Sequence, residues 1–179
     1  MQIAVICCSL NPDSRSTGMA ENLRDPLAEA GARIDWIDLR DHDLPICDGT
    51  TVYGRSDVQA MTARIADADG VILAMPIYNY DGNAAAKNLI ELTGKGAWLN
   101  KTVGFVCSAG SPVSYMSVMP LANSLMLDFR CLILPRFVYA DDRDFDSNGM
   151  SEKIADRLNE LARETVRITA ALADAVAAE

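Results

Sequence analysis

The chain has 179 residues, of which 50% are hydrophobic and 23% are charged, and its formal net charge is −9 at pH 7. This composition is ordinary for a globular protein, and the length suits one domain covering residues 1–179. The acidic balance argues against a nucleic-acid partner, because no basic stripe is present to neutralise phosphates. No apolar run approaches the roughly 18 residues that a membrane-spanning helix needs, so we expect no membrane partner.

Apolar runs and helical periodicities alternate along the whole chain. In chain order they predict a strand at 2–8, a helix at 17–31, a strand at 33–39, a helix opening at 56, a strand at 70–75, a helix at about 83–93, a strand at 101–108, a helix at about 113–127, an interrupted strand at 131–134 and 137–139, and a final helix capped by Ser151.

Local sequence features predict a bend, a helix start and a buried helix face in three of these elements. Pro26 is expected to bend the first helix, since it removes one backbone hydrogen bond. The run Ser56-Asp-Val-Gln59 matches a capping box that opens the second helix. The final helix is expected to turn one apolar face inward, made of Ile154, Leu158, Leu161, Ile168, Leu172 and Val176.

Five strands alternating with five helices predict an α/β protein with a parallel sheet covered on both faces. Right-handed crossovers then favour a three-layer, doubly wound, flavodoxin-like fold with the five-stranded order 2-1-3-4-5. In that order the loops after the first, third and fourth strands converge on one crevice, where open α/β sheets bind ligands.

The loop after the first strand is rich in hydrogen-bond donors. It carries hydroxyls at Ser9, Ser14, Ser16 and Thr17, one guanidinium at Arg15, and it leads directly into a helix. Many neutral donors with one positive charge suit a terminal phosphomonoester at a helix N-terminus. The alternative is that Ser16 or Thr17 only caps the helix.

The loop after the third strand carries the side chains that could hold a flat ring. Pro76, Ile77, Tyr78, Asn79 and Tyr80 offer apolar contacts together with amide and backbone hydrogen bonds. A flat heteroaromatic ligand fits these groups. The alternative is a surface turn whose tyrosines pack on their neighbours, because tyrosine is common at half-buried edges.

The loop after the fourth strand is short and contains small residues. Ser108, Gly110 and Ser111 would let the backbone approach a ligand closely. The N–H groups of this loop would then face the part of the ligand where negative charge collects.

Two motifs resemble those of the NADPH-dependent FMN reductase family. The segment Pro76-Ile-Tyr-Asn-Tyr-Asp-Gly-Asn-Ala-Ala-Ala-Lys-Asn88 is similar to its Pro-x-Tyr-Asn…Lys-Asn element. Ser9, Ser14, Arg15 and Ser16 match its phosphate loop, whereas Cys8 and Asn11 stand where Gly and Arg are usual. The resemblance implies bound FMN, with NADPH or NADH passing hydride to it and on to a small-molecule acceptor by ping-pong exchange.

No residue of the protein is expected to act as a catalytic acid, base or nucleophile, because FMN would carry the chemistry. The only histidine, His42, lies far from the three loops, and neither G-x-G-x-x-G nor a Walker motif occurs. Two alternatives stay open: a flavodoxin-type electron carrier, and a flavodoxin-like binding domain without flavin. Turnover of NADPH would separate the enzyme from the carrier, and a colourless protein after addition of FMN would favour the third.

The cysteines, at positions 7, 8, 47, 107 and 131, are odd in number and lack metal-type spacing. Most lie in or beside strand-like runs, where a free thiol behaves as a small buried hydrophobe, so we predict no metal site and a reduced, cytoplasmic chain. The amino terminus lacks the basic region of a signal peptide.

Association into a homodimer or homotetramer is also expected. A final helix of about 28 residues would extend roughly 42 Å at 1.5 Å per residue and overhang a strand of about 20 Å. The helix at 113–127 adds adaptable apolar side chains, Met116, Met119, Leu125 and Met126, whose alternative role is core packing.

Overall fold

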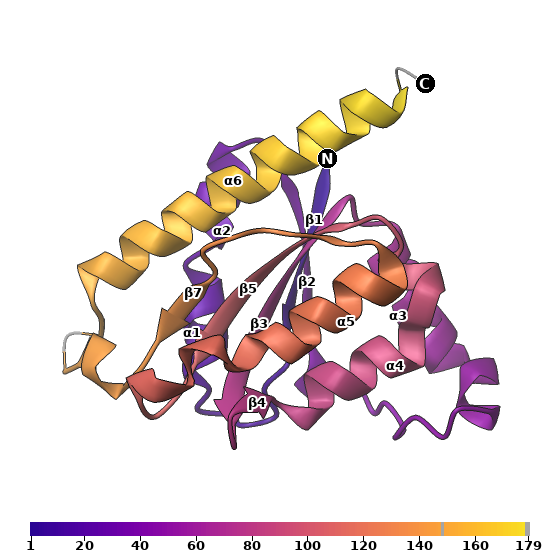
Figure 1. Cartoon of the computed structure of the whole chain (residues 1–179), viewed down its shortest axis with the longest axis horizontal. Helices are drawn as coiled ribbons and strands as arrows, with labels where there is room; N and C mark the ends of the chain where they lie inside the picture. The colour runs from indigo at the N-terminus through magenta and orange to yellow at the C-terminus, as the bar shows by residue number, and fades with distance from the viewer. Residues whose placement is uncertain (148, 178–179) are drawn as a thin grey trace.

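A computed structural model describes residues 1–147 and 149–177, with the side chains of the last helix described as far as residue 173. A mostly parallel sheet runs through the middle of the molecule (Figure 1). Its strands are β1 (Gln2–Cys7), β2 (Arg33–Asp38), β3 (Gly70–Tyr78), β4 (Asp81–Gly82), β5 (Thr102–Ser108), β6 (Leu132–Ile133) and β7 (Val138–Ala140). They follow the order β2-β1-β3-β5-β6, with β4 antiparallel to β3 and β7 parallel to β5.

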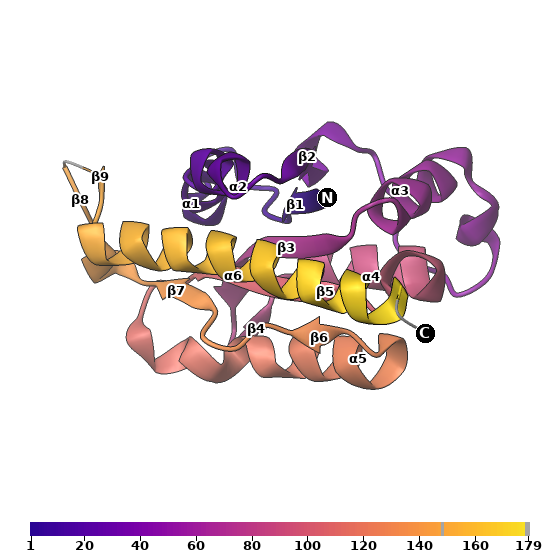
Figure 2. The ribbon, with the colours of Figure 1, turned by 90° about the horizontal axis from the view of Figure 1, so that it is seen from above.

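Helices cover both faces of the sheet (Figure 2). One face packs against α3 (Ser56–Ala66), α4 (Ala84–Trp98) and α5 (Met119–Phe129), and the other against α1 (Arg15–Glu21), α2 (Arg24–Glu29) and α6 (Glu152–Ala177). The central strands are buried on both sides because alternate residues enter opposite cores, Ala4 and Ile6 in one and Ile3 and Val5 in the other. The expected three-layer α/β class is confirmed.

The sheet has seven strands where five were expected. Pro135 and Arg136 divide the last strand into β6 and β7, since proline cannot donate a ladder hydrogen bond. The third strand is longer than expected and turns back into β4, so Pro76, Ile77 and Tyr78 are strand residues and not loop residues.

Two helix predictions near the amino terminus were wrong. The helix expected at 17–31 is two helices, because the ring of Pro26 would clash with the carbonyl four residues earlier, at Asn22, where α1 ends. The capping box at Ser56 does not form. Arg55 is the N-cap of α3, without a side-chain cap bond, and it pairs with Asp57 at 2.6 Å.

The later helices also differ in detail. Pro120 lies in the first turn of α5, so the helix expected at 113–127 becomes the 3-10 helix η3 (Pro112–Val118) followed by α5. Gly94, with φ of +52°, kinks α4, which continues to Trp98. On α6, Leu172 is exposed and not inward-facing, and the side chain of Val176 lies outside the described residues.

Short elements complete the chain: the 3-10 helices η1 (Leu39–Asp41), η2 (Thr51–Gly54) and η4 (Asp142–Asp144), and an antiparallel pair formed by β8 (Phe145–Asp146) and β9 (Gly149–Met150). Among the residues that the structure describes, none of the helices combines the length and hydropathy that crossing a bilayer requires.

Candidate functional site

A cleft of about 240 Å³ opens at the carboxyl ends of β1, β3 and β5. The three segments that the sequence predicted to converge meet there. Its lining residues are Ser9, Asn11, Asp13, Ser14, Arg15, Pro76, Ile77, Tyr78, Ser108, Ala109 and Gly110. Of the predicted site residues, Ser16, Thr17, Asn79, Tyr80 and Ser111 do not line the cleft.

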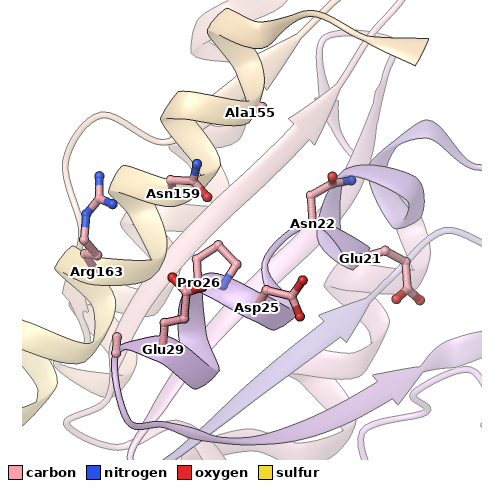
Figure 3. A pocket seen from close by; sticks show the side chains of 9 residues that line it. Glu21, Asn22, Asp25, Pro26, Glu29, Ala155, Asn159 and Arg163 are labelled. Atoms are coloured by element: carbon pink, nitrogen blue, oxygen red, sulfur yellow. The ribbon is translucent and has the colours of Figure 1, made fainter. Parts of the chain in front are cut away.

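A larger cavity of about 710 Å³ lies between α1–α2 and α6 (Figure 3). Its walls carry the carboxylates of Glu21, Asp25 and Glu29, faced across the gap by Asn159 and Arg163 (Figure 3). These side chains come from helix surfaces and not from the carboxyl edge of the sheet, where ligands of open α/β sheets bind. We therefore assign the smaller cleft as the candidate site.

The loop after β1 is held in shape by its own hydroxyls. The Ser14 Oγ accepts a hydrogen bond from the Thr17 N–H at 3.2 Å and lies 3.0 Å from the Ser16 Oγ. Ser14 is therefore the N-cap of α1, a role that the sequence had left open for Ser16 or Thr17. Ser16 and Thr17 are buried behind the loop, while Ser14 borders the cleft.

Arg15 has a partner that the sequence did not reveal. Its guanidinium forms an ion pair with Asp142 and lies 5.0 Å from the centre of the Phe145 ring. The acidic run Asp141-Asp142-Arg143-Asp144 follows β7, which pairs with β5 and ends at the same edge of the sheet. This run is the one sequence feature that hints at an acidic partner for Arg15.

The segment that the sequence predicted to hold a flat ring is a tight hairpin. Tyr78 pairs with Asp81, so Asn79 and Tyr80 form a two-residue connection, and both have left-handed φ angles, +52° and +62°. Two-residue hairpins of the primed type require such angles because their twist matches that of the strands. Both tyrosines are exposed, Tyr78 by 53% and Tyr80 by 67%.

Hydrogen bonds fix the other loops around the cleft. The Asn83 Nδ2 donates to the Cys8 carbonyl at 2.7 Å, which ties the segment after β3 to the end of β1. The Ala109 N–H donates to the Ala140 carbonyl at 3.0 Å. The Ser111 carbonyl accepts a hydrogen bond from the Tyr139 hydroxyl, and Ser111 lies outside the lining of the cleft.

The thiols beneath the cleft are not nucleophiles. Burial raises the pKa of both Cys7 and Cys107 to about 12, so both stay protonated at neutral pH. Cys8 and Cys131 are buried too, as the sequence predicted, and all five cysteines are free. In the described part of the chain, no group of three potential ligands could hold a metal ion. The lining of the cleft combines one guanidinium, several hydroxyls and the side chains of Pro76, Ile77 and Tyr78.

Comparison with known proteins gives consistent matches. The sequence model of the NADPH-dependent FMN reductase family matches residues 1–146. The chain is 27% identical over 138 residues to an NAD(P)H-dependent FAD/FMN reductase from Geobacillus thermodenitrificans, covering 75% of each chain. It is 25% identical over 174 residues to an NADPH:quinone oxidoreductase from Arabidopsis thaliana, covering 90% and 88% of the two chains. An oxidoreductase from Corynebacterium diphtheriae superposes with a TM-score of 0.80 at 19% identity, covering 94% and 96%.

Proposed function

Because this chain belongs to the NADPH-dependent FMN reductase family, we propose that the cleft at the ends of β1, β3 and β5 is where it binds FMN. The protein is an NAD(P)H-dependent flavin oxidoreductase that uses FMN, with NADPH or NADH as co-substrate. Its fold is flavodoxin-like. When bound, FMN supplies the redox chemistry by accepting a hydride from the nicotinamide and passing its electrons to an acceptor.

The donor set of the cleft fits a mononucleotide. We assign the phosphate to Ser9, Ser14 and Arg15, with Ser16 and Thr17 shaping the loop from behind. The ring system is assigned to Pro76, Ile77 and Tyr78, with Asn79 and Tyr80 forming the turn beyond them, and Ser108 and Gly110 border the remaining side, whereas Ser111 lies outside the lining. The residues of the protein then bind and orient FMN and the nicotinamide, which is what hydride transfer between two flat rings needs.

The meeting of the three segments in one cleft is the observation that carries this assignment. A family whose members reduce FMN favours an enzyme over the electron carrier and the flavin-free domain. The exposed Tyr78 ring leaves one face of the site open, which suits alternate visits by nicotinamide and acceptor.

Filling the cleft tests the assignment. A Cβ added at Gly110 would meet only the Asp142 carboxylate, at 4.0 Å, so Gly110→Val adds bulk to the cleft without a clash in the fold. Gly54→Val is the matched control, because a Cβ there meets nothing within 4 Å and Gly54 does not line the cleft. We expect Gly110→Val to abolish FMN binding and FMN-dependent NADPH oxidation, and the control to retain both. Unchanged FMN affinity in Gly110→Val would place the site elsewhere.

We also propose that the protein is a homodimer or homotetramer in which a second subunit helps to wall the cleft. At about 240 Å³ the cleft is smaller than most small-molecule sites. Exposed apolar side chains lie on the neighbouring loops and on η3: Leu10, Tyr78, Tyr80, Val113 and Met116. A second subunit that covered Leu10, Val113 and Met116 would add a wall to the cleft and exclude water from it, while Tyr78 stays accessible. A particle of 19.4 kDa by light scattering would refute this proposal.

Three finer assignments follow from the same reasoning. Counting β6 and β7 as one interrupted strand and leaving β4 aside gives the five-stranded order 2-1-3-4-5. The free cysteines support a reducing compartment such as the cytoplasm. The acceptor is a small molecule of the flavin, quinone or azo class: the similarity to a bacterial FAD/FMN reductase supports a flavin, and the similarity to a plant NADPH:quinone oxidoreductase supports a quinone.

A further inference from the structure

Arg15 provides the positive charge of the cleft, and the carboxylate of Asp142 already pairs with that charge. Of the eleven described residues that line the cleft, Arg15 is the only cationic one. It forms an ion pair with Asp142 and lies over the Phe145 ring. The segment at 142–145 therefore holds the guanidinium on two sides.

The local charge balance is unfavourable for an anion. Asp13 lines the cleft together with Arg15, and Asp142 borders it, with one carboxylate oxygen 4.0 Å from where a Cβ on Gly110 would lie. One carboxylate thus pairs with the only guanidinium of the lining and a second lies in the same cleft, in a protein of net charge −9. A phosphomonoester carries about −1.5 to −2 charges at pH 7, so it has to compete with the Asp142 carboxylate for this guanidinium.

We infer that Asp142 limits the affinity of the site for the phosphate of FMN by competing for Arg15. The inference rests on the proposed function of the cleft and adds a specificity-determining residue to it. A bound phosphate must displace the carboxylate or share the guanidinium with it. FMN is then held weakly enough to leave between turnovers, as an exchanging substrate.

The competing interpretation makes the opposite prediction. If Asp142 positioned Arg15 to receive the phosphate, its removal would weaken FMN binding. The ion pair itself favours competition, since both side chains are about half exposed, 47% for Arg15 and 59% for Asp142. Such a pair is loosely held, so a doubly charged phosphate can replace the carboxylate.

Paired titrations with FMN and riboflavin test the inference, because riboflavin presents the same ring without the phosphate. Asp142→Asn keeps the shape of the side chain and removes its charge. We expect the Kd for FMN to fall about fivefold, the upper range for an exposed ion pair, with the Kd for riboflavin changed less than twofold. Asp25→Asn on α2 is the matched control: it removes the same charge from an exposed site far from the cleft and should change neither Kd.

A second variant shows whether Arg15 mediates the effect. In an Arg15→Gln background, Asp142→Asn should improve FMN binding by less than twofold, since no guanidinium remains to be released. An unchanged or weaker FMN affinity in Asp142→Asn overturns the inference, as does an equal gain for riboflavin. Failure of the wild-type protein to bind either flavin would instead refute the proposed function, and the inference with it.

Discussion

The turn between β3 and β4 stores conformational strain next to the proposed ring site. Tyr80 has a φ of +62° although it carries a Cβ, and the residue is 67% exposed, so packing does little to compensate. The left-handed region costs a non-glycine residue about 1–2 kcal/mol. Glycine escapes that cost but gives the unfolded chain extra entropy worth about 0.4–1 kcal/mol. Tyr80→Gly should therefore be more stable than Tyr80→Ala by about 1 kcal/mol.

The two variants separate strain from ring contacts, because both lack the tyrosine ring. Thermal unfolding followed by circular dichroism should place the Tm of Tyr80→Gly about 2–4 °C above that of Tyr80→Ala. FMN titration should give the two variants the same Kd within about twofold, because Tyr80 lies outside the lining of the cleft and both variants lack its ring. If the alanine variant were the more stable one, the turn would not hold Tyr80 in the left-handed region and the hairpin would be wrong.

Three further predictions concern capping, acid stability and thiol reactivity. Ser14→Ala removes the acceptor of the Thr17 N–H and should cost about 1 kcal/mol, lowering the Tm by about 2–4 °C. Ser14→Asp should restore stability but weaken FMN binding, and equal FMN affinity in both variants would contradict our phosphate assignment. Hydrogen bonds from the Arg143 guanidinium lower the pKa of Asp141 to about 2, so this carboxylate stabilises the fold above its ordinary pKa of 3.8 and the stabilisation is lost as the pH falls toward 2. Asp141→Asn should accordingly destabilise less at pH 3 than at pH 7 in urea unfolding, and an equal loss at both would refute the linkage. Alkylation at pH 8, followed by mass spectrometry, should label Cys47 in the folded protein and the four buried cysteines only after unfolding. Burial raises the pKa of these four thiols, so they carry little reactive thiolate. Labelling of any of the four in the folded protein would contradict this prediction.

The convergence of the three loops could be predicted from sequence because it depends only on strand order. Parallel strands end at a common edge, so the residues after β1, β3 and β5 had to meet there once the alternation of strands and helices was recognised. The burial of four cysteines could also be predicted from the alternation of strands and helices, because these cysteines lie in or beside the strands. These inferences needed no knowledge of individual side-chain contacts.

The hairpin and the acidic partner could not be predicted in the same way. Two-residue hairpin turns usually contain glycine, often as Asn-Gly. The turn Asn79-Tyr80 has the asparagine but no glycine, so its sequence does not predict a hairpin. The contact of Asp142 depends on β7 pairing with β5 in a register that places Ala140 opposite Ser108. That register follows an interruption at Pro135, and local sequence patterns do not specify how a strand resumes after such a break.

In the proposed function, the residues of the protein mainly position FMN and the nicotinamide, and FMN supplies the redox chemistry. The thiols under the cleft are held protonated by burial, and the lining residues contain one cation and no histidine in the part of the chain that is described. On the proposed assignment FMN carries the chemistry, so we expect the rate to depend on how well two rings are aligned and on how fast ligands exchange. A partly neutralised Arg15 and an exposed Tyr78 both favour exchange. On the proposed assignment the same features would weaken retention of FMN by a single subunit, so the oligomeric state and the Asp142 titration both test whether FMN stays bound between turnovers.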